Sequence, residues 1–90
     1  MFNYAVKLDE PAEYVIIVQG RIENNLTDWF KGPVRCVTWT SSSGQAVTMY
    51  AGMIADQAAL HGLINRIRDL GLILLHVDCV TSRCFSINMK

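Results

Sequence analysis

The feature that most constrains this chain is one amphipathic helix pattern at residues 56–70. Its apolar residues recur at steps of three, one, three and three, which places them on one face of a helix. They are Leu60, Leu63, Ile64, Ile67 and Leu70. Asp56 precedes the pattern as an N-cap and Gly71 follows it as a left-handed C-cap. Gly62, which costs about 1 kcal/mol relative to Ala in mid-helix, indicates close packing against a sheet. In 90 residues, such a helix can cover one face of a sheet and leaves little to cover the other.

The rest of the chain is rich in β-branched residues and predicts four strands. These strands are residues 14–22, 34–40, 45–54 and 72–80. The Ser-Ser-Ser-Gly turn at residues 41–44 joins the second and third into a hairpin, and Gly52 predicts a bulge or bend in the third. Residues 23–33 leave room for a helix of one or two turns, with Asn25 or Thr27 as its cap and Gly32-Pro33 as its stop.

The order strand, short helix, strand, strand, long helix, strand predicts an α+β fold of the ferredoxin-like, split βαββαβ type. Right-handed crossovers then place one long and one short helix on one face of a four-stranded antiparallel sheet, with the spatial order 4-1-3-2. We expect this domain at residues 13–80. An N-terminal arm at residues 1–12 would precede it and a polar C-terminal tail at residues 81–90 would follow.

Composition and charge argue against several classes of function. Eight Lys and Arg residues balance eight Asp and Glu residues, and a chain without net positive charge is a poor candidate for nucleic-acid binding. The longest apolar runs, residues 14–18 and 72–75, are far shorter than the ~20 residues of a membrane-spanning helix, so we expect no membrane partner. No secretory signal is visible, and an odd number of cysteines (Cys36, Cys79 and Cys84) does not suit a disulfide framework. We therefore expect a cytoplasmic protein.

The helix and its flanks, residues 54–72, resemble a segment that recurs in small uncharacterised prokaryotic proteins. Those proteins share a core of the form A-D-Q-A-A-L-H-G-L-hydrophobic-x-x-hydrophobic-R-D-L-G-L, which matches residues 55–72 here. Upstream, Gly20-Arg21-Ile22 and Trp29-Phe30-Lys31-Gly32 match two further features of the family. The resemblance spans residues 14–80. It implies a small cytosolic α+β domain with no assigned activity and no catalytic residues to transfer.

The first strand is apolar at five consecutive positions instead of alternating, so it is apolar on both faces. If Ile16 and Val18 face the helices, Val15 and Ile17 face away from them. The same alternation in the third and last strands extends this outward patch. The predicted patch is Val15, Ile17, Val47, Met49, Ala51 and Leu74, with Val37 or Trp39 at its margin. Because a contiguous exposed apolar patch marks an interaction site, we expect a homodimer through this sheet face.

Few residues carry candidate chemistry. His76 and Asp78 lie two residues apart on one strand face, a spacing that suits acid–base work or ligand binding. No nucleophile–base pair can be placed beside them, and no His-x-Glu or Cys-x-x-Cys element is present. We therefore predict no catalytic residue, no metal and no cofactor. Glu23 follows the first strand where an acylphosphatase of this topology holds its anion, and residues 47–52 lack the basic–aromatic pattern of RNA-recognition modules.

Three interpretations of function remain. The favoured one is a non-catalytic homo-oligomeric or protein-interaction module that uses the open face of the sheet, and hence not an enzyme. The alternative is a small-molecule-binding module or enzyme with a pocket between the sheet faces of a dimer. Trp39, Tyr50 and His76 would then contact the ligand. The third is a regulatory or redox role for the cysteines.

Overall fold

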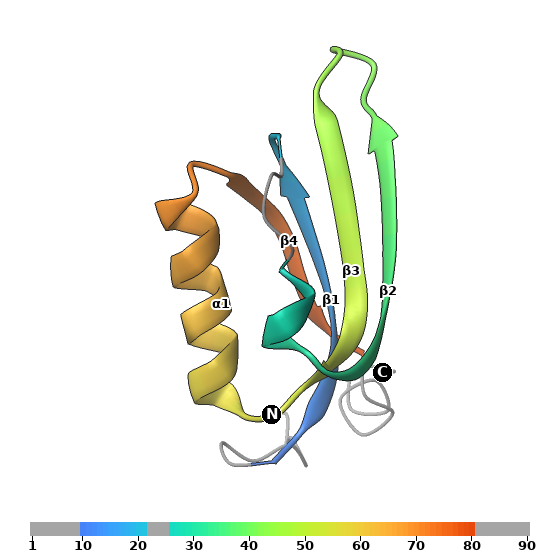
Figure 1. Cartoon of the computed structure of the whole chain (residues 1–90). Coiled ribbons are helices and arrows are strands. Elements are labelled where there is room, and N and C mark those ends of the chain that lie inside the picture. The colour runs from blue at the N-terminus through green and yellow to red at the C-terminus, as the bar shows by residue number, and fades with distance from the viewer. Residues whose placement is uncertain (1–9, 22–25, 81–90) are drawn as a thin grey trace, which may run out of the picture.

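In a computed structural model, which describes residues 10–21 and 26–80, four antiparallel strands form one sheet with an α-helix against one face (Figure 1). The strands are β1 (Ala12–Gln19), β2 (Lys31–Thr40), β3 (Ala46–Ile54) and β4 (Ile73–Cys79), and their order in the sheet is β2-β3-β1-β4. The helix α1 spans Gln57–Asp69, and a 3-10 helix, η1, spans Thr27–Trp29. The predicted C-terminal tail, most of the predicted N-terminal arm, and Asn25 and Cys84 lie outside the described residues.

The prediction of a ferredoxin-like βαββαβ fold with two helices is wrong. The four-stranded antiparallel sheet has the expected strand order, but η1 is the only helical turn described between β1 and β2. Residues 20–30 separate these parallel-running strands. β1 has 8 residues and spans about 26 Å, so a returning α-helix at ~1.5 Å per residue would need about 17 residues. The connection of 11 residues is too short for that.

Gly32 and Pro33, which the sequence suggests as a helix stop, lie inside β2. The register between β2 and β3 shifts between Lys31 and Val34, so these two residues form a bulge. Proline is tolerated there because β2 is an edge strand. The bulge expected at Gly52 in β3 is therefore found in the neighbouring strand β2, next to Val34, the residue that pairs with Gly52.

The helix α1 begins and ends close to where the sequence predicts. The Asp56 side chain accepts a hydrogen bond from the backbone N of Ala59 at 2.8 Å, which is the expected N-cap. Gly71 has a φ of +78°, the left-handed conformation that favours glycine after a helix. The buried residues of the helix all belong to the predicted apolar face; they are Leu60, Leu63 and Ile67.

The core lies between α1, η1 and the near side of the sheet. The strand register pairs Ile16 with Tyr50 and Val18 with Thr48, so these side chains share the helix-facing side. Gln57 of α1 donates a hydrogen bond from Nε2 to the Tyr14 hydroxyl oxygen at 2.7 Å, which ties the helix to β1. The largest fully buried side chains are Ile16, Val18, Leu26, Ile54, Leu63 and Ile67.

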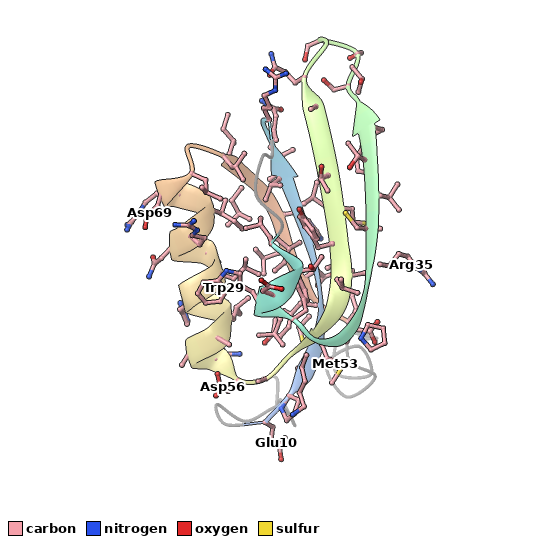
Figure 2. The ribbon with its side chains drawn as sticks, in the orientation of Figure 1. Glu10, Trp29, Arg35, Met53, Asp56 and Asp69 are labelled. Carbon is pink, nitrogen blue, oxygen red and sulfur yellow. The ribbon has the colours of Figure 1, made fainter. Side chains whose placement is uncertain are left out.

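Trp29 holds η1 against the middle of α1 (Figure 2). A Cβ atom added at Gly62 would lie 2.7 Å from Cζ3 of Trp29, closer than such atoms pack. The close packing expected at Gly62 is therefore present, but its partner is η1 and not the sheet. Glycine lets the indole ring approach the helix backbone directly.

Candidate functional site

The side of the sheet turned away from α1 and η1, here called the outer face, is not covered by any described element (Figure 1). Paired residues on neighbouring strands share a face, so the outer face is built of rows that cross the strands. The first row is Arg35, Ala51, Val15 and Asp78. The second row is Val37, Met49, Ile17 and His76, and the third is Trp39, Val47, Gln19 and Ile73.

The centre of the outer face is apolar. Val15 and Ile17 on β1 and Met49 and Ala51 on β3 are all partly exposed. Val47, the fifth residue predicted for this patch on these two strands, is buried and lies between Trp39 and Gln19 in its row. At the β2 edge, the large side chains of Val37 and Trp39 are 44% and 42% exposed.

Leu74 lies apart from the other predicted patch residues. The register between β1 and β4 shifts between Ile17 and Val18, and Leu74 pairs with Val18, whose side chain faces the helix. Leu75 is the extra residue that this shift inserts, and His76 pairs with Ile17 on the outer face. Simple alternation along β4 cannot reveal a bulge, which is why it predicts the wrong side for Leu74.

The β2–β3 hairpin allows the two sheet faces to be compared within one element. The hairpin extends beyond the end of α1 (Figure 1), but Val47 and Thr48 on β3 are each only 4% exposed, so the comparison depends on the exposed residues of β2. On the helix side, the hydroxyl oxygens of Thr38 and Thr48 lie 3.1 Å apart in a hydrogen bond. On the outer side, the neighbouring cross-strand pair is Trp39 and Val47. Along β2 the exposed side chains are Thr38 and Thr40 on the helix side and Val37 and Trp39 on the outer side, so the outer side of this strand is the more apolar one.

Charged residues lie at the two edges of the outer face. Arg35 projects from β2 on the side away from α1 (Figure 2), and Asp78 lies at the same level on β4. Ala51 and Val15 separate them in the row. From the sequence, Asp78 is recognisable only as a neighbour of His76 and Arg35 is not recognisable as a site residue, because strand register is not visible in the sequence.

His76 and Asp78 share the outer face of β4, as their spacing predicts. The His76 Nε2 and Asp78 Oδ2 atoms are 3.8 Å apart, and both side chains are about half exposed to solvent. A pair this exposed contributes little to stability. Within residues 10–21 and 26–80, no group of three His, Cys, Asp or Glu side chains is placed to hold a metal ion.

The three residues predicted to contact a ligand do not converge. Tyr50 is buried on the helix-facing side, where its ring stacks on that of Phe30 with centroids 6.0 Å apart. Trp39 and His76 are on the outer face, but on the two opposite edge strands. No single small ligand on the outer face could therefore reach all three.

The surroundings of Tyr50 stabilise its neutral form. Burial raises the pKa of the Tyr50 phenol above its usual value, and the nearby Cys36 thiol adds to this rise. A hydrogen bond with the backbone of Leu26 acts in the opposite direction and is the weakest of the three effects. Tyr50 is thus a packed core residue and not a proton donor poised near neutral pH.

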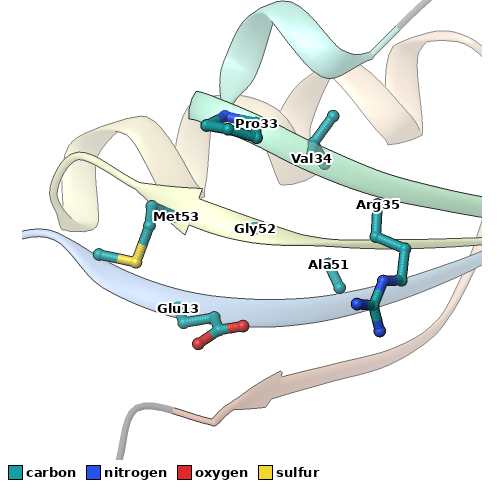
Figure 3. Close-up of a pocket in the computed structure, with 7 residues that line it drawn as sticks. All are labelled: Glu13, Pro33, Val34, Arg35, Ala51, Gly52 and Met53. Atoms are coloured by element: carbon teal, nitrogen blue, oxygen red, sulfur yellow. The ribbon is translucent and has the colours of Figure 1, made fainter.

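An open hollow of about 590 Å³ lies near the β2 bulge (Figure 3). The residues that line it are Glu13, Pro33, Val34, Arg35, Ala51, Gly52 and Met53. Glu13 and Arg35 lie on either side of Ala51, whose small side chain leaves the space between them (Figure 3). This arrangement offers a carboxylate and a guanidinium beside an apolar floor, which suits contact with a charged group of a partner.

Comparison with known proteins identifies a family. The model of a family described as a domain of unknown function, DUF8691, matches residues 13–78, which include β2, β3, α1 and all but one residue of each of β1 and β4. The chain belongs to the DUF8691 family. This agrees with the expected uncharacterised family, and the DUF8691 domain is of α+β type. No curated protein and no solved structure shows a significant match to the chain. None of the described helices of this DUF8691 domain has the length and apolar character needed to cross a membrane.

Proposed function

We propose that this domain is a non-catalytic module that self-associates through the outer face of its sheet. The contrast along β2 supports this proposal best, because the exposed residues Thr38 and Thr40 lie on one side and the exposed residues Val37 and Trp39 on the other. Charged residues at the edges surround an apolar centre, as they do in many protein interfaces. A second copy of the chain is the partner that brings a face of equal size and matching apolar character.

The apolar side chains of the outer face are sufficient in number to drive association. Six partly or largely exposed large ones lie in the three rows: Val15, Ile17, Val37, Trp39, Met49 and Ile73. Two copies bring twelve, and burying a large side chain fully contributes about 1.5–3 kcal/mol. Because these side chains are already partly buried in the single chain, about half of that gain remains, or roughly 9–18 kcal/mol for the pair. Association costs an estimated 4–15 kcal/mol, so a dimer at micromolar concentration is energetically reasonable.

The alternative of a small-molecule module has weaker support. The hollow beside Arg35 has a volume in the range of ligand sites, but its lining contains none of Trp39, Tyr50 and His76. We therefore propose self-association and not ligand chemistry.

We further propose that the domain works in the cytoplasm of a prokaryote. The odd number of cysteines, with Cys36 an exposed thiol, suits a reducing compartment. The helix segment at residues 55–72 resembles one found in small prokaryotic proteins.

The test is to place a charge at the centre of the outer face. In the variant Ile17→Asp, a dimer would bury two carboxylates in an apolar contact, because a symmetric interface repeats every substitution. Losing the burial of two large side chains costs about 3–6 kcal/mol, so the dissociation constant of the dimer should rise more than 100-fold. Sedimentation equilibrium at micromolar concentration measures this, with Met49→Asp as a second variant at the same level of the sheet.

Leu74→Asp is the matched control, because Leu74 is also exposed but faces the helix side of β4. It should leave the dimer intact, and circular dichroism should show all three variants folded. A wild-type chain that sediments as a 10.1 kDa monomer would refute the proposal, as would equal weakening by Leu74→Asp.

A further inference from the structure

The arrangement of charges on the outer face points to one geometry for the pair of copies. The first row runs from a cation at one edge to an anion at the other: Arg35 on β2, then Ala51 and Val15, then Asp78 on β4. Both charged residues are exposed. Among the residues that the structure describes, Arg35 forms no salt bridge within its own chain.

We propose that two copies pack outer face to outer face about a two-fold axis parallel to the strands, so that Arg35 of each copy contacts Asp78 of the partner subunit. This inference rests on the proposed self-association and adds its geometry. A half-turn about such an axis keeps every row at its own level and exchanges the two edges of the sheet. Each β2 then lies over β4 of the partner, and each β3 lies over β1 of the partner.

The same rotation matches the apolar residues. Met49 of one copy lies over Ile17 of the partner subunit, since both belong to the second row on the central strands. In the third row, Trp39 lies over Ile73 of the partner subunit, and these two side chains are 42% and 53% exposed in the single chain. Two of the most exposed apolar side chains on opposite edges would thus cover one another.

The alternative axis, across the strands, fits the charges less well. It would place β2 of one copy over β2 of the other and reverse the order of the rows. Depending on the level of the axis, Arg35 would then face a second Arg35, or Val37 or Trp39 of the partner subunit, and in no case a carboxylate. A second Arg35 brings two like charges together, and Val37 or Trp39 leaves the guanidinium without an anion.

The dimensions are compatible with a modest but specific dimer. Face-to-face sheets lie about 10 Å apart, a gap that an arginine and an aspartate side chain span together. Four strands about 4.8 Å apart and about 26 Å long give roughly 500 Å² per copy, or about 1,000 Å² for the pair, near the lower limit of stable interfaces.

The test reverses each of the two charges in a separate variant and then mixes the two variants. In Arg35→Asp a carboxylate would face Asp78 of the partner subunit, and in Asp78→Arg a guanidinium would face Arg35 of the partner subunit. Each repulsion occurs twice in the symmetric dimer, so each variant alone should dissociate at least about tenfold more easily than the wild type. Arg66→Asp on the exposed surface of α1 is the matched control and should leave the dissociation constant unchanged.

An equimolar mixture of Arg35→Asp and Asp78→Arg should restore association to within about threefold of the wild type. Every contact between positions 35 and 78 in the mixed dimer would again join opposite charges. The double variant Arg35→Asp/Asp78→Arg should give the same recovery in a single chain. Sedimentation equilibrium measures the constants, and circular dichroism confirms that each variant is folded.

Three results would overturn the geometry. One is that the dissociation constant of the mixture stays as high as those of its components, while the Ile17→Asp variant is still monomeric where the wild type is dimeric. The proposed self-association would then stand without this geometry. A second is that the Arg35→Asp variant associates more strongly with wild type than with Asp78→Arg. Residue 35 of one copy would then face residue 35 of the other, and not residue 78. A wild-type monomer would overturn both proposals.

Discussion

Gly62→Ala should destabilise this protein, although alanine favours a helix over glycine. The added Cβ would lie 2.7 Å from the Trp29 ring, below any normal contact distance, so the ring must move away from α1. η1 belongs to the connection that leads into β2, and the displaced ring would loosen its packing on the helix.

The magnitude follows from two opposing effects. Alanine in mid-helix gains about 1 kcal/mol over glycine. Trp29 is 36% exposed, and a tryptophan buried to this degree removes about 150 Å² from water, or about 4 kcal/mol at ~25 cal/mol per Å². If the ring loses half of this contact, the loss is about 2 kcal/mol, and the variant is destabilised by about 1 kcal/mol overall.

A double-mutant cycle tests this reasoning. In a Trp29→Ala background no ring opposes the new methyl group, so Gly62→Ala should stabilise the protein by about 1 kcal/mol. Urea unfolding of the four proteins at one fixed protein concentration gives the free energies, since the stability of an associating protein depends on concentration. If Gly62→Ala has the same sign in both backgrounds, the contact with Trp29 does not explain this glycine.

Two further predictions concern stability. Because burial raises the pKa of Tyr50, the unfolded chain releases the phenolic proton at a lower pH than the folded chain, and stability should fall as pH rises above about 10. Tyr50→Phe removes this contribution, so the stability difference between wild type and variant should shrink from pH 9 to pH 11 (roughly the span around a free tyrosine); a constant difference would contradict it. Asp56→Ala should cost about 1 kcal/mol in urea unfolding because it removes the acceptor for the Ala59 N–H. Asp56→Asn should retain most of that stability, and equal losses in the two variants would exclude capping as the cause.

The local elements were predictable because their signals are local. The spacing of Leu60, Leu63 and Ile67, with Asp56 before and Gly71 after, is enough to define α1. The fold class was not predictable in this way, because it depended on whether residues 20–30 could form a helix that crosses the sheet. Trp29 and Gly32-Pro33 resemble the anchor and the end of a helix, but the length of β1 decides what the connection can be.

The outer face was predictable in part. Alternation along β1 and β3 correctly separates Val15, Ile17 and Met49 from the core residues beside them. It fails on β4, where one extra residue reverses the side of Leu74. The relation between Arg35 and Asp78 depends on three successive strand pairings, and no single segment of sequence contains it.

The two bulges have a consequence for how large an assembly can become. One interrupts β2 and the other β4, and these strands are the two borders of the sheet. A border with a broken hydrogen-bond ladder is a poor template for a further strand, which hinders growth into an endless ribbon. Edges of this kind favour the proposed stacking of two sheet faces over growth at the edges, and a stack closed by one two-fold rotation would stop at two members.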